Sequence, residues 1–191
     1  TVSPARTLGS SCARNARTDP STPRTASASR TNASGSPVPT SAQAMRDEKG
    51  DGIGFFDLWK ATMMGNSARD PLWRAVVSAE VAATPSQEAY IEAKCMRCHS
   101  PMASADAELT GADPVKMTLI GDGTEAGTLA LDGVACALCH QIQPDGLGTA
   151  KSFTGHYVID AVGEMYGPHA APFTMPMVNH TGFKPVQASH V

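Results

Sequence analysis

Two copies of one pentapeptide hold the residues of this chain that are best placed to do chemistry. Residues 95–99 and 136–140 both read Cys-x-x-Cys-His. At this spacing two thiols on one helical turn reach the two vinyl groups of a haem, and the next imidazole reaches its iron. The pattern predicts two covalent c-type haems and therefore electron transfer. The thiols are those of Cys95, Cys98, Cys136 and Cys139, and the proximal ligands are His99 and His140.

Two other kinds of site use paired cysteines. Two Cys-x-x-Cys pairs can form a tetrahedral zinc cage, and one pair can act as a redox dithiol of the thioredoxin kind. Neither site needs a histidine directly after both pairs, as this chain has. The repeated histidine therefore favours haem over both alternatives.

The composition indicates a fold that depends on its cofactors. Of 191 residues only 5% are aromatic, while 17 are glycine and 14 are proline, so side chains alone would make a thin core. We expect a mainly α fold with extensive coil, wrapped around two covalent haems, whose apolar faces supply the missing core. Covalent haem is attached outside the cytoplasmic membrane, so we also expect export to the periplasm or the cell surface. The sequence contains no apolar run of about 18 residues, so it predicts no transmembrane segment.

The first 48 residues differ from the rest. Residues 1–44 contain sixteen Ser or Thr and no aromatic residue. Their five Arg and one Asp give a net charge of +4. Because the whole chain has a net charge of −3, the remaining residues carry −7. We interpret residues 1–48 as a low-complexity tether and 49–191 as the dihaem domain. Cys12, the fifth cysteine, is a weak candidate for a lipid anchor. Nothing in the sequence predicts nucleic-acid binding.

Hydrophobic spacing predicts the helices that present the motifs. Phe55, Phe56, Trp59 and Met63 recur at helical spacing. Asp70 before Pro71 predicts an N-cap. The buried stripe of that helix would comprise Leu72, Trp73, Val76, Val77 and Val81.

The motif helices are expected to follow. The run 84–87, Thr-Pro-Ser-Gln, reads as a capping box that opens the first motif helix, and Pro101 ends it. Residues 101–127 read as loop with at most one short helix, and a second helix is expected from about Leu129 to His140. Beyond it, 153–159 is the one candidate strand.

A six-coordinate electron-transfer haem needs a histidine or methionine on its far side. The candidates are His156, His169, His180 and His190, which lie within thirty-five residues of predicted loop, and Met64, which precedes a glycine that would let a flat macrocycle approach the backbone. The other methionines are interpreted as packing residues. His190 lies one place before the end of the chain, so it is also a candidate ligand for a haem across an interface.

Three stretches resemble the amino-terminal part of exported bacterial multihaem c-type cytochromes. These are 59–73, in which 63–71 is the most specific piece, 94–101 and 132–141. The resemblance spans about 53–191 and implies an electron carrier that passes electrons along closely stacked haems. In that family 176–183 and His190 look like a ligand-bearing stretch ahead of a further motif, whereas this chain ends at Val191.

Three functions remain open. The leading one is a one-electron carrier, not an enzyme, with both irons closed by protein ligands and with redox proteins as partners. The second is a multihaem oxidoreductase acting on a small nitrogen or sulfur compound, which needs one open iron and nearby acid or base groups. The third is a subunit of an extracellular cytochrome filament, a homopolymer or an assembly with further cytochrome subunits.

Overall fold

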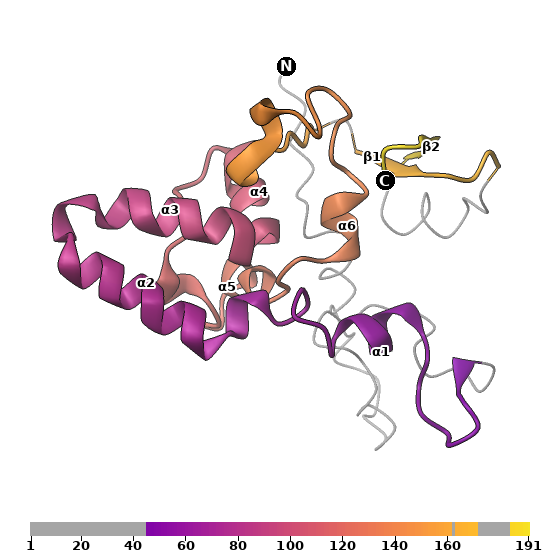
Figure 1. Cartoon of the computed structure of the whole chain (residues 1–191), viewed down its shortest axis with the longest axis horizontal. Helices are drawn as coiled ribbons and strands as arrows, with labels where there is room; N and C mark the ends of the chain where they lie inside the picture. The colour runs from indigo at the N-terminus through magenta and orange to yellow at the C-terminus, as the bar shows by residue number, and fades with distance from the viewer. Residues whose placement is uncertain (1–44, 162, 172–183) are drawn as a thin grey trace, which may run out of the picture.

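The computed structural model describes residues 45–161, 163–171 and 184–191. Across these residues the chain is mainly helical with coil, as expected (Figure 1). The predictions for residues 1–44 and Cys12, and the candidate ligand His180, lie outside the described residues. No helix in the described part is long and apolar enough to cross a membrane.

Helix α1, Phe55–Trp59, is shorter than the spacing predicts, and Met63 lies beyond it. The chain turns back after Trp59, whose carbonyl accepts hydrogen bonds from the amide and the hydroxyl of Thr62. A Cβ on Gly65 would come within 2.6 Å of the Trp59 carbonyl oxygen. This turn therefore requires a glycine at position 65. A single 3-10 turn, η5 (Ser67–Arg69), follows.

Helix α2, Pro71–Ala83, begins as predicted. The Asp70 side chain accepts a hydrogen bond from the Leu72 amide at 2.9 Å. Trp73 and Val77 are buried and Val81 packs against the core, but Leu72 and Val76 are 72% and 50% exposed. The expected five-residue stripe was thus too wide, because α2 lies on the outside of the fold and packs mainly against α3 (Figure 1).

Helix α3, Glu88–His99, carries the first motif and ends at its histidine, with Pro101 just beyond. The predicted capping box is wrong. The side chain of Thr84 makes no capping hydrogen bond, and a 3-10 turn, η6 (Pro85–Gln87), precedes the helix instead.

The segment 101–127, expected to be loop with at most one short helix, contains the ten-residue helix α4 (Pro101–Thr110) and the first residues of a second helix. Its Met102, Ala103 and Ala105 are buried, because small side chains let α4 pack closely against α3. A 3-10 turn, η7 (Met117–Leu119), and α5 (Glu125–Ala130), capped by the Thr124 side chain, complete this region.

The second motif does not continue a helix from Leu129, as the sequence suggested. Helix α5 ends at Ala130, and α6 is a single turn, Cys136–Cys139. Gly133 lies between them at φ +59°, a left-handed conformation that breaks a helix. A Cβ at this position would lie 2.5 Å from the Met64 carbonyl oxygen, so the backbone of the loop at 60–67 passes directly against this glycine.

The last third of the described chain is mostly irregular. The 3-10 segment η8 spans Ala150–Gly155, where a strand was expected to begin, and Thr154 and Gly155 both have positive φ, which excludes a strand there. Strands β1 (Glu164–Gly167) and β2 (Lys184–Gln187) instead form a two-stranded parallel sheet, with Tyr166 opposite Val186.

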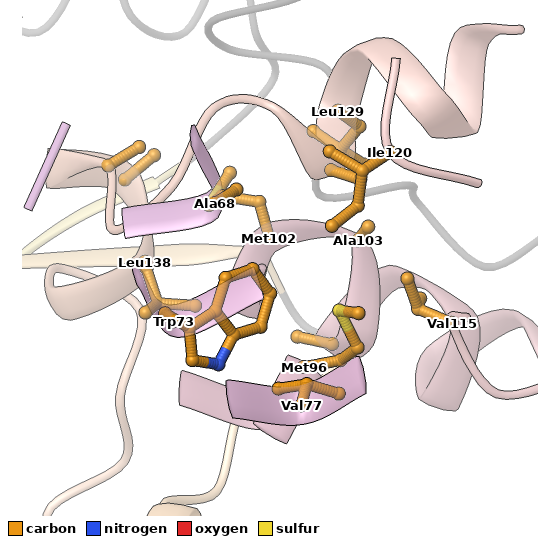
Figure 2. Packing of buried hydrophobic residues seen from close by; sticks show 14 residues of the cluster. Ala68, Trp73, Val77, Met96, Met102, Ala103, Val115, Ile120, Leu129 and Leu138 are labelled. Carbon is orange, nitrogen blue, oxygen red and sulfur yellow. The ribbon is translucent and has the colours of Figure 1, made fainter. Parts of the chain in front are cut away.

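One buried cluster joins the helices. Figure 2 shows Trp73 and Val77 of α2, Met96 of α3 and Leu138 of α6 among its members, with Met102 of α4. Met96 and Leu138 lie between the two cysteines of their motifs. Both motifs are therefore anchored in the same core.

Candidate functional site

Three of the four residues between the cysteines are buried, whereas three of the four cysteines are exposed. In the first motif Met96 is completely buried while Cys98 is exposed and Cys95 is half-buried. In the second motif Ala137 and Leu138 are buried while both cysteines are exposed. The core thus holds each turn in place and leaves its thiols accessible to a reaction partner.

The imidazole of His99 is held from two sides. Its Nδ1 lies 3.1 Å from the backbone carbonyl of Ser67, and the Ser67 hydroxyl donates to the His99 carbonyl at 2.9 Å. The indole of Trp73 stacks on the imidazole, with ring centroids 4.2 Å apart and planes 3° from parallel. Both the direction and the plane of the ring are therefore set before any ligand binds.

The imidazole of His140 is held in a similar way by β1. Its Nδ1 lies 2.6 Å from the carbonyl of Tyr166, and the Tyr166 amide donates to the His140 carbonyl at 2.7 Å. The far side of Tyr166 contacts His190, edge to face, at 4.8 Å between ring centroids. The strand pairing of β1 and β2 thus supports the second histidine indirectly.

These contacts select one tautomer of each ring. A backbone carbonyl only accepts hydrogen bonds, so both Nδ1 atoms carry the proton and both Nε2 atoms keep a lone pair. Histidines that bind metals typically donate their other N–H to a carbonyl or carboxylate in this way. Both motif histidines are therefore prepared as Nε2 ligands.

One thiol of each motif has a raised pKa. Burial raises the pKa of Cys95, and the negative charges of Cys98, Glu80 and Glu92 raise it further, whereas the nearby indole N–H of Trp73 lowers it. That N–H is buried and has no hydrogen-bond partner among the described residues. Burial and the neighbouring Cys136 also raise the pKa of Cys139. Because the thiolate is the species that oxidises, a raised pKa slows the oxidation of Cys95 and Cys139.

Arg97 and Tyr157 join the first motif to the residues that follow η8. Arg97 donates to the carbonyls of Gly155 and Tyr157, both at 2.8 Å, and its guanidinium lies over the Tyr157 ring at 4.2 Å. Burial raises the pKa of Tyr157 to about 12, Arg97 opposes this rise, and the thiols of Cys98 and Cys139 both add to it. The Tyr157 hydroxyl donates to the Arg97 carbonyl at 3.0 Å, so the two residues are linked in both directions.

A cavity of about 500 Å³ opens beside the first motif. His99, Met63 and Met64 line it together with Ser67, Val134 and the start of α2. The structure therefore brings the candidate ligand Met64 to the same cavity as His99, but Met63 lies there equally. The carbonyl of Met64 accepts from the Val134 amide at 3.0 Å, which ties this loop to the approach of the second motif.

The other candidate ligands are dispersed. His156 is exposed beside Lys94, with 3.2 Å between its Nε2 and the lysine Nζ, and both line a cavity of about 610 Å³ on another face of α3. His169 is exposed after β1. His190 is half-buried, and its Nε2 lies 2.9 Å from the Ile142 carbonyl, so within this chain the ring is engaged at the nitrogen that would bind iron.

The described residues contain no group of three or more His, Cys, Asp or Glu side chains that could hold a metal ion by themselves. A zinc cage built from both cysteine pairs is therefore not preformed in this part of the chain. A haem differs in this respect, because the macrocycle supplies four of the iron ligands and the protein needs only one imidazole on each side.

Sequence reasoning missed the groups that orient the two histidines. The Ser67 and Tyr166 acceptors are backbone carbonyls, which no side-chain pattern reveals. Trp73 was expected to be buried, but its stacking on His99 had no signal in the spacing. The role of Arg97 could have been suspected, because a long cationic side chain inside a motif can reach the carbonyls of a neighbouring loop.

No protein-family model, curated protein sequence or solved structure matches this chain.

Proposed function

We propose that this protein transfers electrons through two c-type haems, the first bound covalently to Cys95 and Cys98 and the second to Cys136 and Cys139. The observation that carries the proposal is the matched pair of hydrogen bonds from His99 Nδ1 to Ser67 and from His140 Nδ1 to Tyr166. A thioredoxin-like dithiol or a sulfur cage has no use for two imidazoles prepared in this way.

The residues of the chain would have separate tasks. The four thiols would add to the vinyl groups of the macrocycles, and His99 and His140 would bind the irons through Nε2. The bound haem supplies the one-electron chemistry. Ser67 and Tyr166 make their histidines better donors by accepting the Nδ1 protons. The raised pKa values of Cys95 and Cys139 keep these two thiols protonated and slow their oxidation.

The shared core of the two motifs supports electron exchange between the two groups. Met96 and Leu138, which each lie between the cysteines of a motif, belong to the same buried cluster. Two haems attached there would be near neighbours, and the transfer of electrons from one to the other would need no large motion of the chain.

The test is the haem content of the exported protein. The chain is produced with a bacterial system that attaches haem outside the cytoplasm, and intact mass and the pyridine haemochrome spectrum are measured. We expect two haems in the wild type and one in each of Cys95→Ala/Cys98→Ala and Cys136→Ala/Cys139→Ala. Cys12→Ala is the matched control and should keep both haems.

Two results would contradict the proposal. The first is a wild-type mass without haem under conditions in which a known c-type cytochrome is matured. The second is stoichiometric zinc that both double variants lose together, which would indicate a shared sulfur cage. The visible spectrum of the ferric and ferrous protein addresses the enzyme alternative, because low-spin iron at both sites leaves no open position for a substrate.

A further inference from the structure

We infer that Trp73 is a positioning residue for the first haem: it fixes the plane of the His99 imidazole and stabilises the oxidised state of the iron that His99 binds. The inference rests on the proposed function and goes beyond it, because it assigns a difference between the two haems to one side chain.

The first step is geometric. Trp73 is only 8% exposed and belongs to the buried cluster, so its indole cannot move without disturbing the core. The His99 ring lies 3° from parallel to it at 4.2 Å, while Ser67 holds Nδ1 from the edge. The hydrogen bond restricts where Nε2 points, and the stack restricts rotation about that direction. Together they leave the ligand one orientation.

The second step is electrostatic. An imidazole bound to ferric iron carries more positive charge than one bound to ferrous iron, because the metal withdraws more electron density from it. The face of an indole is the most electron-rich of the aromatic side chains, and it attracts cations most strongly where water is excluded. Stacking by Trp73 therefore favours the ferric state and lowers the reduction potential of the first haem.

The second site lacks such a partner. Among the described residues, no aromatic ring is stacked in parallel on His140. Its neighbour Tyr166 contributes a carbonyl to Nδ1 and turns its ring to His190. Removal of the Trp73 indole should therefore change one haem and leave the other as it was.

The experiment uses the haem-loaded, full-length protein. Trp73→Leu removes the aromatic face, and Trp73→Phe keeps a smaller one. Trp59→Phe is the matched control, since Trp59 donates to the Val134 carbonyl at 2.8 Å and does not stack on either motif histidine. Haem content is measured first, followed by potentiometric titration and low-temperature electron paramagnetic resonance of the ferric protein.

We expect Trp73→Leu to raise one of the two midpoint potentials and to shift or broaden the resonance of one ferric haem. Trp73→Phe should give a smaller change in the same direction, and Trp59→Phe should give neither. If Trp73→Leu does not accumulate, the Trp73→Phe protein decides the matter through the same two readouts.

The possible failures are distinguishable. A wild-type protein without haem overturns the proposed function. Two haems in the wild type, with unchanged potentials and resonances in the Trp73 variants, overturn only the role of Trp73. A shift of both potentials by equal amounts would also overturn it, because it would indicate a general loosening of the core.

Discussion

The Ser67 hydroxyl donates to the backbone carbonyl of His99 at 2.9 Å, while the backbone carbonyl of Ser67 faces His99 Nδ1 at 3.1 Å. The two residues, thirty-two positions apart, are therefore linked in both directions. The bond to the His99 carbonyl fixes the end of α3, and the contact with Nδ1 fixes the imidazole ring of His99. The turn at 60–67 is thus part of the first site, although it contains no cysteine or histidine.

Ser67→Ala separates these two links. The variant loses the hydroxyl donor but keeps the carbonyl that accepts from Nδ1, so we expect haem attachment to persist and the free energy of unfolding to fall by about 1 kcal/mol. Urea unfolding of the haem-loaded protein measures the loss. Ser78→Ala is the control, since its hydroxyl bonds only to a carbonyl of its own exposed helix turn and its removal should cost less. Equal losses in the two variants would contradict the special role of Ser67.

Arg97 should hold η8 and the following residues against the first motif. Arg97→Lys keeps the charge but loses the guanidinium group, whose nitrogens donate to two carbonyls at once. We therefore expect the free energy of unfolding to fall by about 1–3 kcal/mol. Amides near 155–157 should exchange hydrogen faster. Glu108→Gln removes only the exposed ion pair of Arg97, at 2.6 Å, and should cost under about 1 kcal/mol. Unchanged exchange rates at 155–157 in Arg97→Lys would show that the loop is held by other contacts.

Gly133 should tolerate no side chain. A Cβ there would lie 2.5 Å from the Met64 carbonyl oxygen, and φ is +59°. We expect Gly133→Ala to destabilise the fold by more than about 2 kcal/mol and to reduce occupancy of the second haem. Gly50→Ala is the matched control, because its φ is also positive, at +83°, but a Cβ would meet nothing within 4 Å. If the two variants lose the same stability, the contact with Met64 is unimportant.

Asp132 should make stability depend on pH. Burial raises its pKa to about 6, and the nearby Arg69 opposes the rise. Between about pH 4 and 6 the folded state then binds a proton that the unfolded chain does not, so the free energy of unfolding falls as pH rises and levels off above 6. The change is on the order of 3 kcal/mol.

Asp132→Asn should flatten this slope, which chemical unfolding at several pH values can measure. Asp122→Asn provides the opposite case, since hydrogen bonds from Thr124 lower the pKa of Asp122. Its contribution should be lost as pH falls through that lowered pKa. A wild-type slope that survives in Asp132→Asn would assign the pH dependence to another group.

The sequence by itself predicted the reactive groups and some of the local boundaries. Two identical spacings of Cys, Cys and His predicted the reactive groups, because one helical turn places them side by side whatever surrounds it. The Asp70 cap and the end of α3 at His99 also followed from local rules, since caps and prolines act within a few residues. The helix at 101–110 was allowed for but not located, because its small residues show little periodicity.

Only the tertiary structure decided how the site is assembled. The carbonyls of Ser67 and Tyr166 and the stack of Trp73 on His99 join residues at least twenty-six positions apart. Local propensity cannot specify such contacts, because they depend on where the turn at 60–67 and strand β1 pack. The break at Gly133 has the same cause, since it is the passing backbone of Met64, and not the sequence around 133, that leaves no room for a side chain.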